Sequence, residues 1–431
     1  MNIVLVNHYA GGPDHGMEFR PHQLARHWVA DGHDVTILAG SWSHLRHRNP
    51  QVPDRVLEER IDGIRHRWLR TPRYEGNGLG RIRSIHAFLR AVDRERRTFL
   101  ADRDIDAVIA SSTYPFDIDP CRRIARDHDA LLVWEVHDLW PLSPIELSGY
   151  SPRHPFIRVT QRAEDRCCRD ADLVISILPR AIDHLRTRGL DDARYLAIPN
   201  GAARVEPSGS VEPSTSIARD RIAAHRAAGR FTLAYAGTHG EHHGLDTLLD
   251  AMARLDRTGF AAVFLGEGPE KVALQRTAAA HGLTHVDFLD RVPRADAIAA
   301  MAAADASFAG LRGHPLYRFG IGLNKIFDGM LAARPIVGSY TAGNDPITEA
   351  ACGVRVEADD AAALARAIES LAATPPADRD AMGRRGAAFV AANHDYAVLA
   401  RRFVNAIERR RAESGARPGT RTGTKPRATT G

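Results

Sequence analysis

Residues 315–330, in the second half of the chain, form a glycine-containing stretch that runs into a short apolar pattern. The polar residues of this stretch have the types and spacing of an anion-binding site. Gly320 and Gly322 let the backbone approach a ligand closely, and Asn324 or Gly322 can cap the helix expected to follow. Unpaired N–H groups at a helix start favour an anion, and Lys325 adds a full positive charge beside them. Asp328 lies one helical turn after Asn324, so it can accept hydrogen bonds from sugar hydroxyls in the same site. The segment predicts a sugar-nucleotide site; the alternative is an ordinary loop and helix with solvated Lys325 and Asp328.

Two strand ends in the first half of the chain also carry polar residues. The apolar run 3–6 is followed by the loop 7–16, which contains several glycines and precedes an amphipathic pattern. A strand, a glycine-rich loop and a helix in that order favour phosphate or a second substrate. His137 and Asp138 follow the apolar run 131–136, and ligands gather at the carboxyl ends of parallel strands. His137 can donate a hydrogen bond to a bound sugar, or it can be a structural histidine paired with Asp138.

Length and composition indicate a globular protein with two cores. The chain has 431 residues, of which 44% are hydrophobic and 26% charged. The four cysteines have no C-x-x-C spacing, so neither a zinc site nor a disulfide framework is implied. The first apolar run is too short for a signal peptide, and no apolar stretch approaches the ~20 residues of a spanning helix. We expect a cytoplasmic protein.

Positive charge is concentrated on one predicted helix in the first half of the chain. Arg83, His86, Arg90, Arg94 and Arg97 recur at three- and four-residue steps, which places them on one helix face. Such a face can rest on anionic lipid headgroups, so peripheral contact with the inner face of the cell membrane is one interpretation. A solvated helix face is the alternative. No nucleic-acid-binding motif accompanies these arginines.

Strand-like apolar runs alternate with helical patterns almost throughout, which predicts an α/β fold with two Rossmann-like, doubly wound parallel sheets. Composition changes near Asn200-Gly201, where a polar stretch rich in Pro and Ser begins. The predicted organisation is an N-terminal domain at 1–201, a linker at 202–229, a C-terminal domain at 230–395, a last helix at 396–411 and a disordered tail at 412–431.

Five segments, in this order along the chain, resemble family 4 glycosyltransferases with the two-domain GT-B fold. They are Phe19-Arg-Pro21, Glu135-Val-His-Asp-Leu-Trp-Pro141, Ile198-Pro-Asn-Gly201, Tyr235-Ala-Gly-Thr238 and Pro315-Leu-Tyr-Arg-Phe-Gly-Ile-Gly-Leu-Asn-Lys-Ile-Phe-Asp328. The resemblance covers about the first 400 residues. The subgroup it is most similar to comprises fucosaminyltransferase-like enzymes of bacterial cell-surface polysaccharides.

The resemblance implies a C-terminal domain that binds a nucleotide-sugar donor and an N-terminal domain that supplies most of the acceptor site. The reaction would be a hexosyl transfer in the cleft between them, with retained anomeric configuration and with neither metal nor cofactor. The last helix would cross back to the N-terminal domain. The two acidic triplets 104–106 and 117–119 are interpreted as surface or turn residues rather than as a metal site.

Site residues follow from the resemblance position by position. His137 matches the histidine that contacts the donor sugar, and Gly11 and Gly12 match the glycine loop near the donor phosphates. Asp328 falls at the second position of a family pair of glutamates, the one near the ribose, while Gly320 stands where the first would be. Thr238 and His243 occupy the places of an arginine and a lysine that neutralise the diphosphate. Donor-binding or catalytic roles are thereby expected for His137, Lys325, Asp328, Gly11, Gly12, Thr238, His243, Gly320, Gly322, Leu323 and Asn324.

The acceptor is expected to be a glycan or a polyprenyl-diphosphate-linked saccharide. Asp14, His15 and Glu18 are weaker candidates to contact it. Two other functions stay open: a sugar-nucleotide epimerase of the same fold, and a catalytically silent binding or scaffold protein. The missing first glutamate and the presence of Thr238 and His243 favour the second of these.

Overall fold

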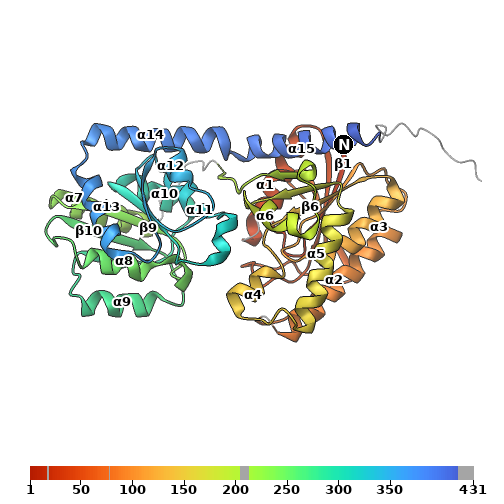
Figure 1. Cartoon of the computed structure of the whole chain (residues 1–431), viewed down its shortest axis with the longest axis horizontal. Helices are drawn as coiled ribbons and strands as arrows, with labels where there is room; N and C mark the ends of the chain where they lie inside the picture. Colours follow the sequence, from red (N-terminus) through yellow and green to blue (C-terminus); the bar gives the residue numbers. More distant parts are fainter. Residues whose placement is uncertain (17–18, 77, 204–212, 416–431) are drawn as a thin grey trace, which may run out of the picture. The chain divides into compact units, whose positions relative to one another are not determined.

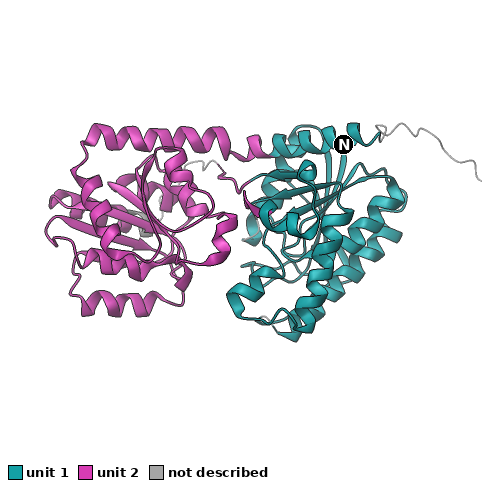
Figure 2. Cartoon of the chain, viewed as in Figure 1, with its two compact units in different colours: residues 1–177, 182–198, 400–431 teal, residues 178–181, 199–399 magenta. Residues whose placement is uncertain are grey.

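The chain forms two compact units in the computed structural model, which describes residues 1–16, 19–76, 78–203 and 213–415 (Figures 1 and 2). Unit 1 holds residues 1–177, 182–198 and 400–431. Unit 2 holds residues 178–181 and 199–399. Unit 1 is therefore assembled from separate stretches of the sequence, including the last helix.

A mostly parallel sheet forms the centre of unit 1. Its described strands follow the order β3-β4-β2-β1-β5-β6-β7-β8. They are β1 (Asn2–Val6), β2 (Asp34–Gly40), β3 (Val56–Ile61), β4 (Ile64–Leu69), β5 (Ala107–Ala110), β6 (Leu131–Val136), β7 (Leu173–Ser176) and β8 (Tyr195–Ala197). Leu5 of β1 lies opposite Ile37 of β2 and Ile109 of β5, and all three side chains are fully buried. The central strands are apolar on both faces because helices cover both faces of the sheet (Figure 1).

Strands β3 and β4 form an antiparallel hairpin that the alternating pattern of the sequence did not predict. The two residues between them, Asp62 and Gly63, have φ values of 51° and 79°. Positive φ at both central positions is the requirement of the tight hairpin turn that matches the twist of the strands. Strand β4 pairs in parallel with β2, so the hairpin extends the sheet at its edge.

The helices of unit 1 pack against this sheet, and the last of them comes from the end of the chain. They are α1 (Phe19–Ala30), α2 (Leu79–Arg97), α3 (Ile118–His128), α4 (Leu142–Ser148), α5 (Pro155–Asp170), α6 (Ala181–Leu185) and, from Ala400 on, α15 (Tyr396–Glu413). The buried indole of Trp28 donates to the Ala400 carbonyl at 3.0 Å and packs on the Phe403 ring, with 5.1 Å between centroids. None of the described helices is both long and apolar enough to span a membrane.

Unit 2 is a second parallel sheet with helices on both faces. Its described strands follow the order β11-β10-β9-β12-β13-β14. They are β9 (Phe231–Ala236), β10 (Phe260–Leu265), β11 (Val286–Leu289), β12 (Ala306–Gly310), β13 (Ile336–Ser339) and β14 (Gly353–Val356). The helices are α7 (Pro213–Ala227), α8 (Leu245–Met252), α9 (Lys271–Ala280), α10 (Arg294–Ala303), α11 (Asn324–Leu331), α12 (Pro346–Glu349), α13 (Ala361–Ala373) and α14 (Pro376–Asn393). Tyr235, Phe264 and Phe308 form an aromatic centre under the carboxyl ends of three neighbouring strands.

Helix α7 corrects the predicted linker 202–229. Ala218 and Ile222 on this helix are fully buried against Ala234, Val263 and Leu265 of the unit 2 sheet. Burial of these apolar residues makes α7 part of the folded unit, although polar residues surround them in the sequence. Residues 204–212 of the predicted linker and 416–431 of the predicted tail lie outside the described residues.

Candidate functional site

The loop before α11 has a backbone conformation that only glycine adopts easily. Gly320 has φ 109°, and a Cβ at this position would lie 2.6 Å from the Pro179 side chain. The amide of Asn344 binds both polar groups of the next residue, because its oxygen accepts from Ile321 N at 2.7 Å and its nitrogen donates to Ile321 O at 3.3 Å. The Asn200 side chain donates to Gly322 O at 3.3 Å. The loop is thus held from both sides.

Backbone donors stay available where this loop becomes helix α11. Within the described residues, no acceptor is recorded for the N–H groups of Gly322, Leu323, Asn324 and Lys325. The Ile326 N–H is the first to be used, donating to Leu323 O at 3.1 Å. Open N–H groups at the positive end of a helix are the elements of an anion site.

Lys325 lies beside these donors and crosses the loop that follows β9. Gly237 makes room for it, since a Cβ there would lie 2.2 Å from Lys325 Cε. The Lys325 ammonium lies 3.3 Å from His243 Nε2 and 5.8 Å from the centre of the Tyr235 ring. In the described part of the chain it has no ion pair with a carboxylate. Burial lowers the pKa of Lys325 to about 8, with a smaller opposing effect from Asp328.

Two histidines line the same loop in their neutral form. Burial, with the nearby Lys325 charge, lowers the pKa of His243 to about 4. His239 is fully buried among the rings of Tyr235, Phe264 and Phe288, and burial lowers its pKa to about 4. Neither His239 nitrogen has a hydrogen-bond partner among the described residues. At neutral pH Lys325 therefore carries the positive charge here, while Thr238, predicted for this loop, is exposed.

Asp328 forms an ion pair with Arg294, a contact that the sequence did not indicate. Its Oδ1 accepts from Arg294 Nε at 3.0 Å and from Arg294 Nη2 at 2.5 Å. Arg294 also donates to the Ala203 carbonyl at 3.0 Å, which fixes its position at the start of α10. The second Asp328 oxygen is not used by this pair, so it can accept from a ligand hydroxyl.

In unit 1, polar side chains meet at the carboxyl ends of β1, β5 and β6, which are neighbours in the sheet. His137 Nε2 lies 3.0 Å from Ser111 Oγ and 3.2 Å from Glu135 Oε2. Ser111 Oγ donates to the same glutamate oxygen at 2.6 Å, and Asn7 donates to Ser111 O at 2.6 Å. These contacts fix the His137 ring on a buried polar base.

Glu135 is the fully buried centre of that base. Arg20 Nε donates to its other oxygen at 2.9 Å, and Arg20 also donates to the Ile198 carbonyl at 2.9 Å. Burial opposes ionisation, but the charge of Arg20 and the contacts with His137 and Ser111 hold the pKa of Glu135 well below its usual range. Arg20 and Glu135 lie in sequence segments that matched the family, yet their pairing was not predicted.

Two aspartates have structural roles. Asp138 accepts from Trp140 Nε1 at 3.1 Å and from Ser143 Oγ at 2.5 Å, which orders the chain after β6. Asp117, interpreted as a surface or turn residue, lies in the turn before α3, where it is fully buried and accepts from Ser112 N at 2.8 Å. Burial raises the pKa of Asp117 to about 7.

The glycine loop after β1 is buried and tightly held. Gly11 and Gly12 are buried, and Gly12 N donates to His15 Nδ1 at 3.2 Å. His15 itself packs on Trp68 and is largely buried, whereas Asp14 is exposed. Glu18 lies outside the described residues. The structure thus gathers Lys325, His243, Gly237 and the α11 start in unit 2, and His137 with Glu135, Ser111 and Arg20 in unit 1.

Both units match known protein families. Residues 15–201 match the family described as a glycosyl transferase 4-like domain, and residues 230–374 match glycosyl transferases group 1. Searching curated protein sequences gave no match.

Similar solved structures cover nearly the whole chain. Sucrose-phosphate synthase from Thermosynechococcus elongatus has a TM-score of 0.67 at 18% identity, covering 96% of this chain and 100% of its own. HepE from Anabaena, in complex with UDP-glucose, has a TM-score of 0.63 at 16% identity, covering 95% and 100%. WaaG, a glycosyltransferase involved in lipopolysaccharide biosynthesis, has a TM-score of 0.62 at 15% identity, covering 94% and 99%. The predicted fold of two parallel-sheet α/β domains is confirmed.

Proposed function

Because this chain belongs to the family 4 glycosyltransferases and has their two-domain GT-B fold, we propose that it moves a sugar from a nucleoside diphosphate to a glycan or lipid-linked acceptor in cell-surface polysaccharide biosynthesis. The observation that supports this most is the half-buried Lys325 beside the open N–H groups of α11. A cation and oriented donors with no carboxylate partner among the described residues suit the two phosphates of such a donor.

Charge stabilisation is the main chemical task of this site. Cleaving the glycosyl–phosphate bond leaves negative charge on the diphosphate, which Lys325 and the N–H groups from Gly322 to Lys325 would stabilise. With a pKa of about 8, Lys325 is mostly protonated at neutral pH, and a bound phosphate favours its charged form further. The free oxygen of Asp328 would accept from a ribose hydroxyl.

His137 would orient the transferred sugar, because its ring is fixed by Ser111 and Glu135. We propose a transfer of hexosyl type with retention, in which the leaving phosphate accepts the proton of the acceptor hydroxyl. Such a step needs no protein base and no metal. Thr238, exposed on the loop after β9, and the buried Gly11 and Gly12 after β1 stay candidate donor contacts, and Asp14 and His15 stay candidate acceptor contacts.

Binding of nucleoside diphosphates and their sugars, followed by thermal shift, tests the proposal. UDP-glucose is the first ligand to try, because HepE is solved with it. A ligand at about 100 times its Kd should stabilise the wild type by roughly 2.7 kcal/mol. Lys325→Met, which keeps the chain length and removes the charge, should weaken binding at least about tenfold, and Asp328→Ala should weaken it less. Exposed Arg366→Ala and Asp250→Ala are the matched controls in the same unit.

Turnover separates the enzyme from its rivals. Release of free nucleotide only when an acceptor is present supports a transferase. Interconversion of the sugar nucleotide without acceptor would instead identify an epimerase. Donor binding without turnover over a broad acceptor panel would favour a silent binding protein, and no binding of any nucleotide would contradict the donor site itself.

A further inference from the structure

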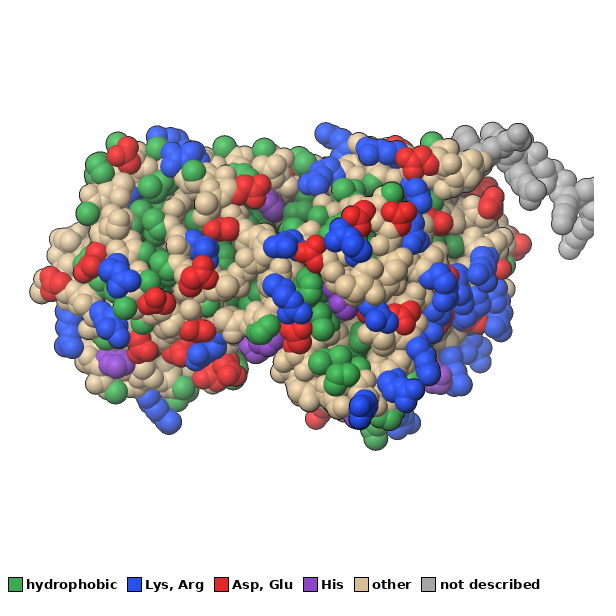
Figure 3. Space-filling model, in the orientation of Figure 1, with side chains coloured by type: hydrophobic (Ala, Val, Ile, Leu, Met, Phe, Trp, Pro, Cys, Tyr) green, Lys and Arg blue, Asp and Glu red, His purple; other side chains and the backbone are tan. Residues whose placement is uncertain are grey.

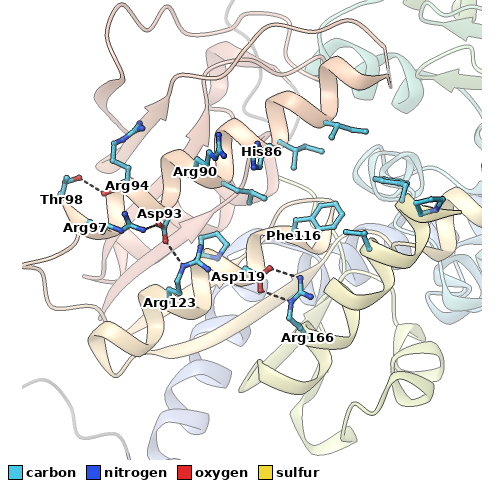
Figure 4. Close-up of a pocket in the computed structure, with 17 residues that line it drawn as sticks. His86, Arg90, Asp93, Arg94, Arg97, Thr98, Phe116, Asp119, Arg123 and Arg166 are labelled. Carbon is cyan, nitrogen blue, oxygen red and sulfur yellow. Dashed lines mark hydrogen bonds and ion pairs between the residues drawn. The ribbon is translucent and has the colours of Figure 1, made fainter. Parts of the chain in front are cut away.

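An apolar groove crosses the surface of unit 1 between α2 and α5. It has a volume of about 1110 Å³. Ile82, Ile85 and Leu89 of α2 line it, and so do Phe156 and Val159 of α5 and Pro120 of α3. Phe116, which precedes α3, also lines it (Figure 4). Most of the surface exposed in the groove is apolar, although charged side chains, among them Asp93 and Asp119, line it as well.

The groove continues into a second cavity of about 460 Å³ along α4. The two share Ile82, Ile85 and Phe156. Asp138 and Trp140 are among the residues that line the second cavity, and Asp138 directly follows His137 in the chain. The two adjoining cavities therefore extend from the segment that follows the proposed sugar-orienting histidine to the end of α2.

Large apolar side chains along this path are unusually exposed. Leu79 is 78% exposed and Val159 is 50% exposed, and Ile82, Leu147 and Tyr150 are each more than two-fifths exposed. Of the large apolar side chains that stand exposed in the described residues, only Ile217 and Val272 lie elsewhere, in unit 2. Exposed apolar surface concentrated in one place marks a binding surface.

Arginines border the groove at the α2 end. Arg90, Arg94 and Arg97 line it, and Figure 4 shows them along the helix above Phe116. In the described part of the chain, Arg90 and Arg94 have no ion-pair partner, while Arg97 pairs with Asp93 at 2.5 Å. Figure 3 shows arginine side chains gathered over this part of unit 1. The basic face predicted from the sequence is thus real and exposed.

We propose that this groove holds the hydrocarbon chain of a polyisoprenoid-phosphate-linked acceptor. A long branched hydrocarbon matches the apolar surface and the volume of the groove, and its burial supplies the binding energy. The unpaired arginines match the anionic headgroups of the membrane that contains such a lipid. This inference deepens the proposed function and rests on it for the reaction, because Asp138, which lines the second cavity, directly follows His137 in the chain.

Flotation with vesicles of equal charge tests the groove. One set contains phosphatidylcholine and phosphatidylglycerol; in the other, undecaprenyl phosphate replaces the phosphatidylglycerol at equal charge. We expect the wild type to bind the second set about tenfold more tightly. Val159→Asp and Ile82→Asp should remove this preference. Val272→Asp, an equally exposed valine changed in the same way on α9 of unit 2, should keep it.

Each outcome has a distinct meaning. Equal binding to both sets would overturn the proposal and leave a surface that recognises membrane charge alone. A preference for undecaprenyl phosphate that survives Val159→Asp and Ile82→Asp would also overturn the proposal. Nucleotide thermal shift on the same variants separates the two proposals. Loss of lipid preference with intact nucleotide binding supports the groove, whereas lipid preference without any nucleotide binding keeps the groove and contradicts the transferase.

Discussion

Lys325 is a cation held where a cation is disfavoured. Its side chain is half-buried beside Gly237 and Tyr235, and its neighbour His243 is neutral. The Asp328 carboxylate raises the Lys325 pKa only in part, and one of its oxygens is bound by Arg294. A bound diphosphate would supply the missing negative charge, so ligand binding and proton binding at Lys325 should be coupled.

This coupling predicts how affinity changes with pH. The folded pKa of Lys325, about 8, lies below its ordinary value of 10.5. As the pH rises through about 8 the free protein loses this proton, so affinity for a nucleoside diphosphate should fall, approaching tenfold per pH unit. The ligand phosphates are already ionised there, since their second pKa is near 6. Calorimetric titration from pH 7 to 9.5 measures the effect.

Lys325→Met supplies the control for that titration, because it should bind weakly at every pH. The lowered pKa of Lys325 also predicts how the free energy of unfolding changes with pH. Between pH 8 and 10.5 the unfolded chain binds more protons than the folded one, so the free energy of unfolding of the ligand-free wild type should rise with pH relative to Lys325→Met. Affinity that is constant from pH 7 to 9.5 would contradict the role of Lys325.

At the scale of elements, the loop after β9 is shaped to admit Lys325. Gly237 has φ 153°, and a Cβ there would lie 2.2 Å from Lys325 Cε, so Gly237→Ala must displace the lysine. We expect nucleotide binding to weaken by about tenfold or more, because misplacing one charged contact costs on the order of 1–3 kcal/mol. Gly240→Ala is the matched control in the same loop, with no atom nearer than 3.8 Å to the added carbon.

Both variants should stay folded, and thermal unfolding without ligand checks this. If Gly237→Ala bound nucleotide as tightly as Gly240→Ala, the position of Lys325 would not matter for the ligand.

Elements differ in how far the sequence determines them. Alternating apolar runs predicted the parallel strands, because a strand buried on both faces leaves a continuous apolar signature. The β3–β4 hairpin was missed, although Asp62-Gly63 is a strong signal for a tight hairpin turn. Helix α7 was interpreted as part of a linker because the stretch that leads into it is polar and rich in Pro and Ser. Its buried residues Ala218 and Ile222 were too few to signal a helix packed on the sheet.

The site was predictable only in part, for a related reason. Local spacing placed Lys325 and Asp328 on the start of one helix. The pairing of Arg20 with Glu135 and of Arg294 with Asp328 joins residues distant in the chain, and spacing carries no information about such contacts. The sequence contained these residues, and only the fold brings them together.

At the scale of the whole molecule, both units bury histidines that stay neutral. Burial lowers the pKa of His66 in unit 1 to about 3 and that of His239 and His243 in unit 2 to about 4. Between pH 6.5 and 4 the unfolded chain binds these protons and the folded chain does not. The free energy of unfolding should therefore fall as the pH falls, by up to ~1.4 kcal/mol per pH unit for each such group. Chemical denaturation from pH 7 to 4.5 measures this.

His66→Phe isolates one contribution. His66 is fully buried beside Trp68, and neither of its nitrogens has a partner among the described residues. The variant should gain stability over the wild type as the pH falls, while His86→Phe, on the exposed face of α2, should follow the wild type. Parallel pH profiles for His66→Phe and the wild type would contradict the assignment.

The contact between Trp28 and the last helix has a consequence for folding of the protein during its synthesis on the ribosome. Unit 2 draws almost all its residues from one continuous stretch, 199–399, whereas unit 1 needs residues from Ala400 on to cover Trp28. Synthesis therefore delivers the second unit whole while the first still lacks its final helix. Until translation passes Phe403, the Trp28 indole of the nascent unit 1 lacks its contact with the last helix. Unit 1 is therefore the first to begin synthesis and the last to be completed.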